Sequence, residues 1–375
     1  MSRPLSQPVP DTVALEELEG SEKEELRVLV VRMSAMGDVI HGIPAIAALR
    51  VARANWRVGW LIEQRWMELL CAHETERMRP RSEHKPITDW VHVSDFQGWR
   101  GELSSPATWR EMRSCMREVR AMKYQVALDL QGTIRSAMAG RLSGAKTRIG
   151  AEKPKEGQAR RFYTSAVATP DKHVVESALS LASAVAGEDL NYEEPVFPHD
   201  PATEAWADRF CMSIGFAPLA VLNPGAGWGA KCWPARSYGE VAKALTDRGM
   251  AVMVNYGPKE ESLGQAVREA SDDLARTVPC SVSQLIALTR RASLFVGGDT
   301  GPMHLAAALG VPVVALFGPT HPERNGPYAT RSVVLRSPDS ADNSSHDDAP
   351  DAALQSISPR EVIAAADSLL KEQND

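Results

Sequence analysis

The sequence lacks the patterns of membrane-spanning and disulfide-linked proteins. No run of about eighteen consecutive apolar residues occurs, so no transmembrane helix is predicted. The first residues, MSRPLSQPVPDTVALEELEGSEKEE, lack a basic segment followed by an apolar one, so we expect no secretory signal. C-x-x-C spacing and an even cysteine count are also missing, which argues against a disulfide framework and a cysteine zinc site. The five cysteines are Cys71, Cys115, Cys211, Cys232 and Cys280. We therefore expect a reduced, cytoplasmic setting.

Patterns for metal and nucleic-acid binding are missing as well. The nine histidines form no H-x-x-x-H pair, so we expect no metal site and no cofactor. The net charge of −6 argues against general nucleic-acid binding. Residues 1–25 carry two basic and seven acidic side chains, net −5, and are predicted to form a flexible acidic tail. Residues 132–161 carry eight Lys or Arg against two Glu, net +6, which indicates a solvated loop or a site for one anionic ligand.

What the sequence does contain is a repeated alternation of strands and helices. The first half predicts strands at 26–33, 56–63, 90–95 and 124–132, with helices at 108–123 and 173–189. The second half predicts strands at 219–225, 250–257, 293–299 and 311–318, with helices at 203–214, 237–249, 258–271, 281–292 and 301–310. Continuous Val- and Leu-rich runs are typical of strands buried on both faces of a parallel sheet. We therefore predict an α/β fold with two doubly wound, Rossmann-like domains that face a central cleft.

The domain boundaries follow from composition. We predict an N-terminal domain at 26–190, a proline-rich linker at 191–202 and a C-terminal domain at 203–357. Within the second domain, residues 337–352 hold five Asp and no Lys or Arg, which predicts a mobile surface loop. A last helix at 358–375 has Ser358 as its N-cap and Glu361 at N3, and it could pack back on the first domain.

The clearest local motif is FVGGDTGPMHLAAALGVPVVALFGPT at 295–320. A strand ends at Gly297 and Gly298, and Asp299 to Pro302 open a helix. Unpaired N–H groups and the helix dipole would favour an anion such as a diphosphate there, with Thr300 and His304 as further donors. Taken alone, an ordinary helix cap and a core histidine would explain the same residues.

A second loop, LNPGAGWGAKCWPARSY at 222–238, also follows a strand. Its glycines permit close backbone approach to a ligand, and Lys231 fits a phosphate contact. It matches neither the Walker A pattern nor G-x-G-x-x-G. Two such loops in one α/β domain favour nucleotide-diphosphate binding. Near residue 260, Glu260 or Glu261 could bind ribose hydroxyls or simply complement a helix dipole.

The segment RMSAMGDVIHGIPAIAALR at 32–50 raises the question of a catalytic carboxylate. Pro44 predicts a helix that begins near Ile43, so 34–42 would be a loop at the end of the first strand. Asp38 would then lie too early to cap that helix, and we predict that it faces the cleft as a base.

Four motifs together resemble one family. MSAMGDVIHGIPA, DLQGTIRSA, AKCWP and GGDTGPMHLAAALGVPVVALFGPT occur in the order found in bacterial ADP-heptose:lipopolysaccharide heptosyltransferases, and most resemble heptosyltransferase I. The resemblance covers about residues 26–370. It implies a GT-B fold and an inverting, metal-independent glycosyltransferase. The implied donor is ADP-L-glycero-D-manno-heptose and the implied acceptor is the Kdo sugar of the lipopolysaccharide inner core.

The resemblance also implies residue roles. Asp38 would be the general base, and Lys231 would stabilise the leaving group. The donor site would consist of Gly227, Lys231, Glu260, Asp299, Thr300, Gly301 and His304. The acceptor site would consist of Ser34, Met36, Gly37, Gln131, Arg135, Lys155 and Arg160. The basic segment would then bind anionic Kdo and lipid A phosphates, with transient contact to the inner face of the inner membrane.

Three alternatives remain open at this stage. The first is a related GT-B enzyme with another donor or acceptor, such as a heptosyltransferase II-like protein. The second is a nucleotide-sugar epimerase, and the third is a catalytically silent protein that binds a nucleotide sugar.

Overall fold

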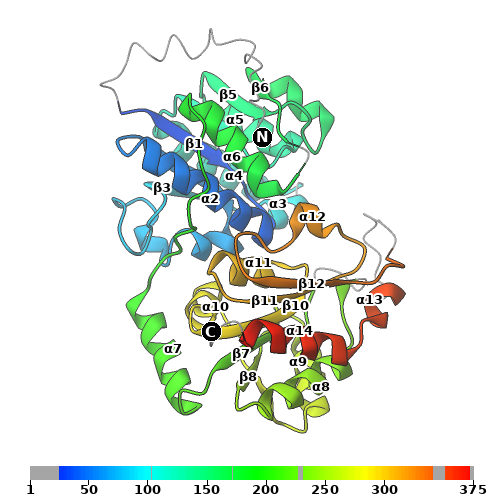
Figure 1. The fold of residues 1–375 in the computed structure, drawn as a ribbon. Coiled ribbons are helices and arrows are strands. Elements are labelled where there is room, and N and C mark those ends of the chain that lie inside the picture. The colour runs from blue at the N-terminus through cyan, green and yellow to red at the C-terminus, as the bar shows by residue number, and fades with distance from the viewer. Residues whose placement is uncertain (1–24, 103, 171, 227–230, 341–350, 372–375) are drawn as a thin grey trace.

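The computed structural model describes residues 25–102, 104–170, 172–226, 231–340 and 351–371, and these form two lobes (Figure 1). Each lobe holds a six-stranded sheet, ordered β3-β2-β1-β4-β5-β6 in the first and β12-β11-β10-β7-β8-β9 in the second. Every strand pair is parallel. Counted from its own first strand, each sheet has the order of a doubly wound Rossmann fold. The predicted pair of Rossmann-like domains is confirmed.

The first lobe runs from β1 to α6. Its strands are β1 (Arg27–Val31), β2 (Arg57–Glu63), β3 (Trp90–Ser94), β4 (Val126–Asp129), β5 (Thr147–Ala151) and β6 (Ser165–Val167). Its α-helices are α2 (Met36–Ala52), α3 (Phe96–Gly101), α4 (Pro106–Ala121), α5 (Ile134–Leu142) and α6 (Val174–Ala186). Three 3₁₀ helices complete it: η1 (Gln64–Leu69), η2 (Glu74–Glu76) and η3 (Gly157–Phe162).

The second lobe runs from α7 to α14. Its strands are β7 (Leu219–Asn223), β8 (Ala251–Val254), β9 (Arg276–Thr277), β10 (Ala292–Gly298), β11 (Val313–Phe317) and β12 (Ser332–Arg336). Its helices are α7 (Pro201–Ser213), α8 (Ala235–Thr246), α9 (Glu261–Ala270), α10 (Val282–Thr289), α11 (Gly301–Ala308), α12 (Pro322–Asn325), α13 (Ala352–Ser356) and α14 (Pro359–Lys371).

The period of two along β1 explains how helices cover both faces of the first sheet. Val28 and Val30 belong to a core shared with α2 and α6, whereas Leu29 and Val31 belong to a core shared with α4 and α5. All four side chains are fully buried. Burial of each contributes roughly 1.5–3 kcal/mol, which favours this sandwich of helix, sheet and helix.

The lobes touch through helices that start at facing sheet ends. A Cβ atom on Gly37 of α2 would lie 2.4 Å from the His304 ring of α11, and one on Gly301 would lie 2.6 Å from Met36. Only glycine permits this approach at either position. Leu285, from α10, is also part of the core of the first lobe.

Four sequence predictions need correction. Helix α2 begins at Met36 rather than near Ile43, and Pro44 lies inside it at the cost of one backbone hydrogen bond. The predicted loop at 34–42 is therefore wrong. The irregular linker spans 188–200 rather than 191–202, because Asp200 caps α7 at Pro201.

The other two corrections concern the C-terminal third. Helix α14 packs on α8 and the second sheet, not on the first domain, because Val362, Ala366 and Leu369 complete the core of the second lobe. Of the loop predicted at 337–352, residues 341–350 lie outside the described part, and Ala352 already starts α13. Of the acidic tail predicted at 1–25, residues 1–24 also lie outside the described part.

Among the residues that the structure describes, no helix combines the length and apolarity needed to cross a bilayer.

Candidate active site

Most of the predicted site residues that the structure describes lie near the two points where strand order reverses. In the first sheet these are the carboxyl ends of β1 and β4, and in the second the carboxyl ends of β7 and β10. Ligands of doubly wound sheets bind in the crevice outside such strand ends. The contact between α2 and α11 brings the two switch points to one interlobe junction.

Asp38 lies at the N3 position of α2, directly after β1. One carboxylate oxygen accepts the N–H of Ala35, 3.2 Å away, as an N3 residue does when it closes a helix start. The other oxygen pairs with Arg32 Nη2 at 2.7 Å, and Arg32 Nε also donates to the Asp38 carbonyl at 3.0 Å. The Asp38 side chain remains 41% exposed. A fixed orientation and access from solvent are what a base for an incoming hydroxyl requires.

Lys231, Asp299 and His304 form a connected group in the second lobe. Lys231 Nζ pairs with Asp299 Oδ2 and donates to the Asp299 carbonyl at 3.2 Å, while His304 Nε2 lies 3.1 Å from Asp299 Oδ1. Burial opposes the charge of Asp299, but the hydrogen bond from His304 and the charge of Lys231 hold its pKa well below the usual range. The lysine loop and the start of α11 therefore meet at this group.

A pair of histidines continues this group across the lobe junction. His41 Nε2, from α2, lies 3.2 Å from His304 Nδ1. Because His304 Nε2 is bonded to a carboxylate, the consistent arrangement has His304 donating to Asp299 and His41 donating to His304. The His41 ring also meets the edge of His173, whose Nε2 donates to Gly326 O at 3.0 Å.

Both His41 and His173 are held neutral by their surroundings. Burial, followed by the neighbouring His304, lowers the pKa of His41 well below its ordinary value. Burial also lowers the pKa of His173. His41 and His304 line a cavity of about 20 Å³ between the lobes, together with Tyr192 and Tyr328.

The predicted ribose carboxylate has a defined place. Glu260 is the N-cap residue of α9, after β8, and its side chain makes no capping hydrogen bond; instead its Oε2 accepts the N–H of Gly257 at 2.7 Å. A Cβ atom on Gly225 would lie 2.1 Å from this carboxylate, so Glu260 faces the glycine loop after β7. Glu261 is exposed in the first turn of α9. Gly227 lies outside the described residues.

Thr300 occupies the start of the helix that carries His304. It is the N-cap residue of α11, and its hydroxyl donates to Gly298 O at 3.3 Å. Gly301, the first residue of α11, lies against Met36 of α2. The predicted anion-binding helix start therefore lies at the lobe junction, opposite the start of α2.

Four of the predicted acceptor residues surround the end of β1. Gln131 Oε1 accepts the N–H of Met33 at 2.8 Å, which places the turn after β4 beside Ser34. Met36 and Gly37 are buried against α11. This turn is fixed by the buried Asp129, which sequence analysis did not single out.

Asp129 holds the turn through both of its oxygens. Oδ1 accepts N–H groups of Gln131 at 2.8 Å and Gly132 at 3.0 Å, and Oδ2 accepts the hydroxyls of Ser136 at 2.9 Å and Tyr163 at 2.7 Å. Burial raises the pKa of this carboxyl.

The other three acceptor candidates have exposed side chains on one side of the first lobe. Arg135 lies in the first turn of α5, Arg160 in η3, and Lys155 in the loop between β5 and η3. The backbone N–H of Glu156 donates to Gly132 O at 2.9 Å, so this loop lies against the turn after β4. Arg148, by contrast, is structural, because its guanidinium donates to Phe162 O at 2.7 Å.

Sequence reasoning missed two histidines at the lobe junction, His41 and His173. His41 lies in the loop predicted at 34–42, where Asp38 rather than a histidine is the predicted base, and His173 follows no predicted strand. The signal for His41 is its place in the MGDVIHG motif, three residues after Asp38. His173 opens the helix predicted at 173–189 and carries no comparable signal.

Known proteins resemble this chain over most of its length. The profile of the family described as glycosyltransferase family 9 (heptosyltransferase) matches residues 112–351. Lipopolysaccharide heptosyltransferase 1 of Pseudomonas aeruginosa is 29% identical over 316 residues, which cover 83% of this chain and 84% of that protein. Lipopolysaccharide heptosyltransferase 1 of Escherichia coli K12 is 26% identical over 320 residues, which cover 84% and 94%.

Solved structures show the same fold. The glycosyl transferase family 9 protein of Veillonella parvula superposes with a TM-score of 0.78 at 24% identity, covering 94% of this chain and 99% of that one. The E. coli heptosyltransferase WaaC with ADP-2-deoxy-2-fluoro heptose gives a TM-score of 0.69 at 24% identity, covering 93% and 100%. The two facing Rossmann-like lobes are those of a GT-B fold. With the family profile matching residues 112–351, the chain belongs to glycosyltransferase family 9, the heptosyltransferases.

Proposed function

We propose that this enzyme transfers heptose from ADP-heptose to a Kdo-containing lipopolysaccharide acceptor, with inversion and without a catalytic metal. The observation that carries the proposal is the interlobe junction. Gly37, the residue before Asp38, contacts His304 of α11, whose N-cap is Thr300, so we place the carboxylate and the anion-binding helix start at one crevice. The names of the relatives, which are lipopolysaccharide heptosyltransferases, support the choice of substrates.

Inverting transfer needs a base on one side of the anomeric carbon and stabilisation of the leaving group on the other. Asp38 would take the proton of the acceptor hydroxyl as its oxygen bonds to the anomeric carbon. Lys231 and the amino end of α11 would stabilise the departing ADP diphosphate with preorganised donors. Asp299 contributes by fixing the Lys231 ammonium, and Glu260 would bind the ribose hydroxyls.

The acceptor would bind on the first lobe. Gln131, Ser34 and the exposed cations Arg135, Lys155 and Arg160 lie on the side where an anionic Kdo sugar and lipid A phosphates would meet positive charge. A lipid acceptor implies that the enzyme works at the inner face of the inner membrane through transient surface contact. This location is part of the proposal.

The test is a panel of donors with and without acceptor. ADP-, UDP- and GDP-sugars are incubated with the protein, with and without Kdo-lipid A, and nucleotide release is measured in EDTA. We expect ADP release from ADP-heptose only when the Kdo acceptor is present. Release from a UDP-sugar without acceptor would instead indicate an epimerase, and no release from any donor would indicate a binding protein. A requirement for an acceptor that already carries heptose would indicate a heptosyltransferase II-like enzyme.

A further inference from the structure

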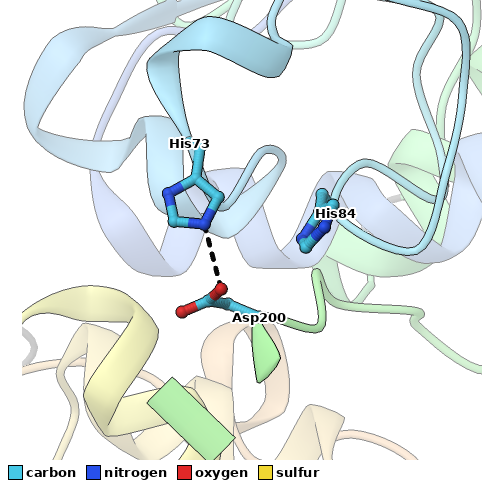
Figure 2. A group of neighbouring side chains, drawn as sticks. All are labelled: His73, His84 and Asp200. Carbon is cyan, nitrogen blue, oxygen red and sulfur yellow. Dashed lines mark hydrogen bonds and ion pairs between the residues drawn. The ribbon is translucent and has the colours of Figure 1, made fainter. Parts of the chain in front are cut away.

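A cluster of His73, His84 and Asp200 lies where the interlobe linker meets the first lobe (Figure 2). One nitrogen of each histidine and one carboxylate oxygen all lie within 4.8 Å of one another. None of the three residues belongs to the candidate active site. The absence of H-x-x-x-H spacing could not reveal this group, because its members come from distant positions in the sequence.

Each member is held by local backbone structure. His73 is the N-cap residue of η2, and His84 lies in the turn closed by the bridge between Ser82 and Lys85. Asp200 is the N-cap of α7. The N–H of His199 donates to Glu83 O at 2.9 Å. Because these residues directly precede Asp200 and His84, this bond attaches the linker to the turn beside the cluster. The backbone therefore brings the three side chains together whether or not a ligand is present.

Hydrogen bonding within the cluster is incomplete. His73 Nε2 lies 2.9 Å from Asp200 Oδ1, and Asp200 Oδ2 accepts both the N–H of Thr203 at 2.9 Å and its hydroxyl at 2.5 Å. By contrast, Nδ1 of His84 is buried and has no hydrogen-bond partner among the described residues. A buried polar atom without a partner costs free energy, so this nitrogen calls for a ligand.

We propose that His73, His84 and Asp200 bind a zinc ion. Two imidazoles and one carboxylate are a donor set that suits zinc, with water as the fourth ligand. Zinc–ligand distances of about 2.0–2.2 Å place tetrahedral ligand atoms roughly 3.4 Å apart. Side-chain rotations that move each ligand atom by about 1 Å would therefore bring the three atoms onto one ion. The hydrogen bonds from Thr203 fix the second oxygen of Asp200, as outer-shell partners do in metal sites.

The bound ion would join the two lobes at the linker. His73 and His84 belong to the first lobe, whereas Asp200 begins the first helix of the second. Zinc that binds the folded protein stabilises it by mass action, so the midpoint of thermal unfolding should rise with zinc concentration. The zinc site is separate from the proposed glycosyl transfer, which uses no catalytic metal.

The experiment uses the full chain, stripped with EDTA, dialysed, and titrated with Zn²⁺ alone by calorimetry. We expect one saturable site in the wild type. His84→Ala removes a ligand whose Nδ1 makes no hydrogen bond in the described structure, so the metal-free variant should stay folded and allow direct comparison with the wild type. Zinc affinity should fall by at least about 100-fold, since even outer-shell partners are worth about 10–100-fold. His321→Ala, at the exposed N-cap histidine of α12, is the matched control and should bind zinc like the wild type.

Cobalt substitution tests the geometry independently of stability. Co²⁺ bound by two imidazoles and a carboxylate should give visible absorption in the wild type that is absent in His84→Ala and in Asp200→Asn. The proposal is wrong if the wild type shows no saturable zinc binding, or if His84→Ala binds zinc as tightly as the wild type does. Either result would mean that His73 and Asp200 form only a hydrogen bond that attaches the linker.

Discussion

At the scale of single residues, Asp38 closes a helix start and yet keeps a partly exposed carboxylate. Its N3 position and its bond from Ala35 are those of a residue that closes a helix start. Its pairing with Arg32 and its partial exposure leave the carboxylate oriented and reachable. From the sequence alone, a capping role and a role as base exclude each other, because proline is typical of the first turn of a helix and Pro44 therefore suggests a later start. The structure places Asp38 in the first turn of α2 with its carboxylate still partly exposed, so the capping position does not exclude the proposed role as a base.

Lys231→Ala tests the donor side of the crevice. Loss of a charged hydrogen-bond donor, worth about 1.5–3 kcal/mol, should weaken ADP binding by roughly 10- to 150-fold. The substitution also leaves Asp299 without its cation, with a side chain only 6% exposed. Breaking a buried ion pair costs about 3–5 kcal/mol, so the free energy of unfolding should fall as well.

The measurement for this variant is ADP affinity by calorimetry, combined with urea unfolding. Lys231→Arg, which retains the positive charge, is the control and should keep much of both properties. ADP affinity equal to that of the wild type in a folded Lys231→Ala protein would remove Lys231 from the donor site.

At the scale of secondary-structure elements, α2 and α11 form the contact on which the account depends. Both start at a switch point, and they approach each other closely enough for His41 and His304 to bond across the junction. Arg32, Asp299 and His173 are the other charged or titratable groups that act on His41. This buried group of histidines should make stability depend on pH.

The sign of that dependence follows from the lowered pKa values of His41 and His173. Below about pH 6.5 each histidine takes up a proton in the unfolded chain but not in the folded one. The contribution of the two neutral histidines to the free energy of unfolding is therefore fully present above that pH. It is lost as pH falls, by up to about 1.4 kcal/mol per pH unit for each histidine.

His41→Gln should reduce this loss. Urea unfolding at pH 7.5, 6.5 and 5.5 measures the free energy of unfolding of the variant and of the wild type. We expect the free energy of unfolding to decrease less between pH 6.5 and 5.5 in the variant, because one of the two histidines no longer contributes. The control variant His321→Gln should follow the wild type. If the free energy of unfolding changed equally with pH in His41→Gln and in the wild type, His41 would not be a source of the pH dependence.

Elements with strong local signals could be predicted from sequence. The capping box of α14 is present, with the N–H of Ser358 donating to Glu361 at 2.8 Å and that of Glu361 donating to the Ser358 hydroxyl at 3.3 Å. Helix α6 ends at Gly187, which has a left-handed φ of 76°. Elements that depend on tertiary contacts were missed. Strand β6 has only three residues and lies at the sheet edge, and β5 is stabilised by pairing with β4 and β6 rather than by its own pattern.

At the scale of the whole molecule, the fold was predictable because each half repeats the same alternation of strand and helix. Strand ends in a doubly wound sheet lie at predictable places, so residues such as Asp38 and Asp299 could be placed after β1 and β10 from sequence. The residues that lie next to them across the lobe junction could not be predicted from sequence. The contact of His41 with His304 and the approach of His84 to Asp200 depend on how the lobes and linker pack, and no spacing in the chain encodes that.

The most direct test of the account is heptosyl transfer by Asp38→Asn. Asparagine can still accept the N–H of Ala35, so the helix start and the fold should be kept, while the base is lost. With ADP-heptose and Kdo-lipid A, mass spectrometry measures the heptosylated product, and calorimetry measures ADP affinity. The account predicts a rate lower by about 10²–10⁴-fold with ADP affinity nearly unchanged. Transfer at the wild-type rate by Asp38→Asn would contradict it.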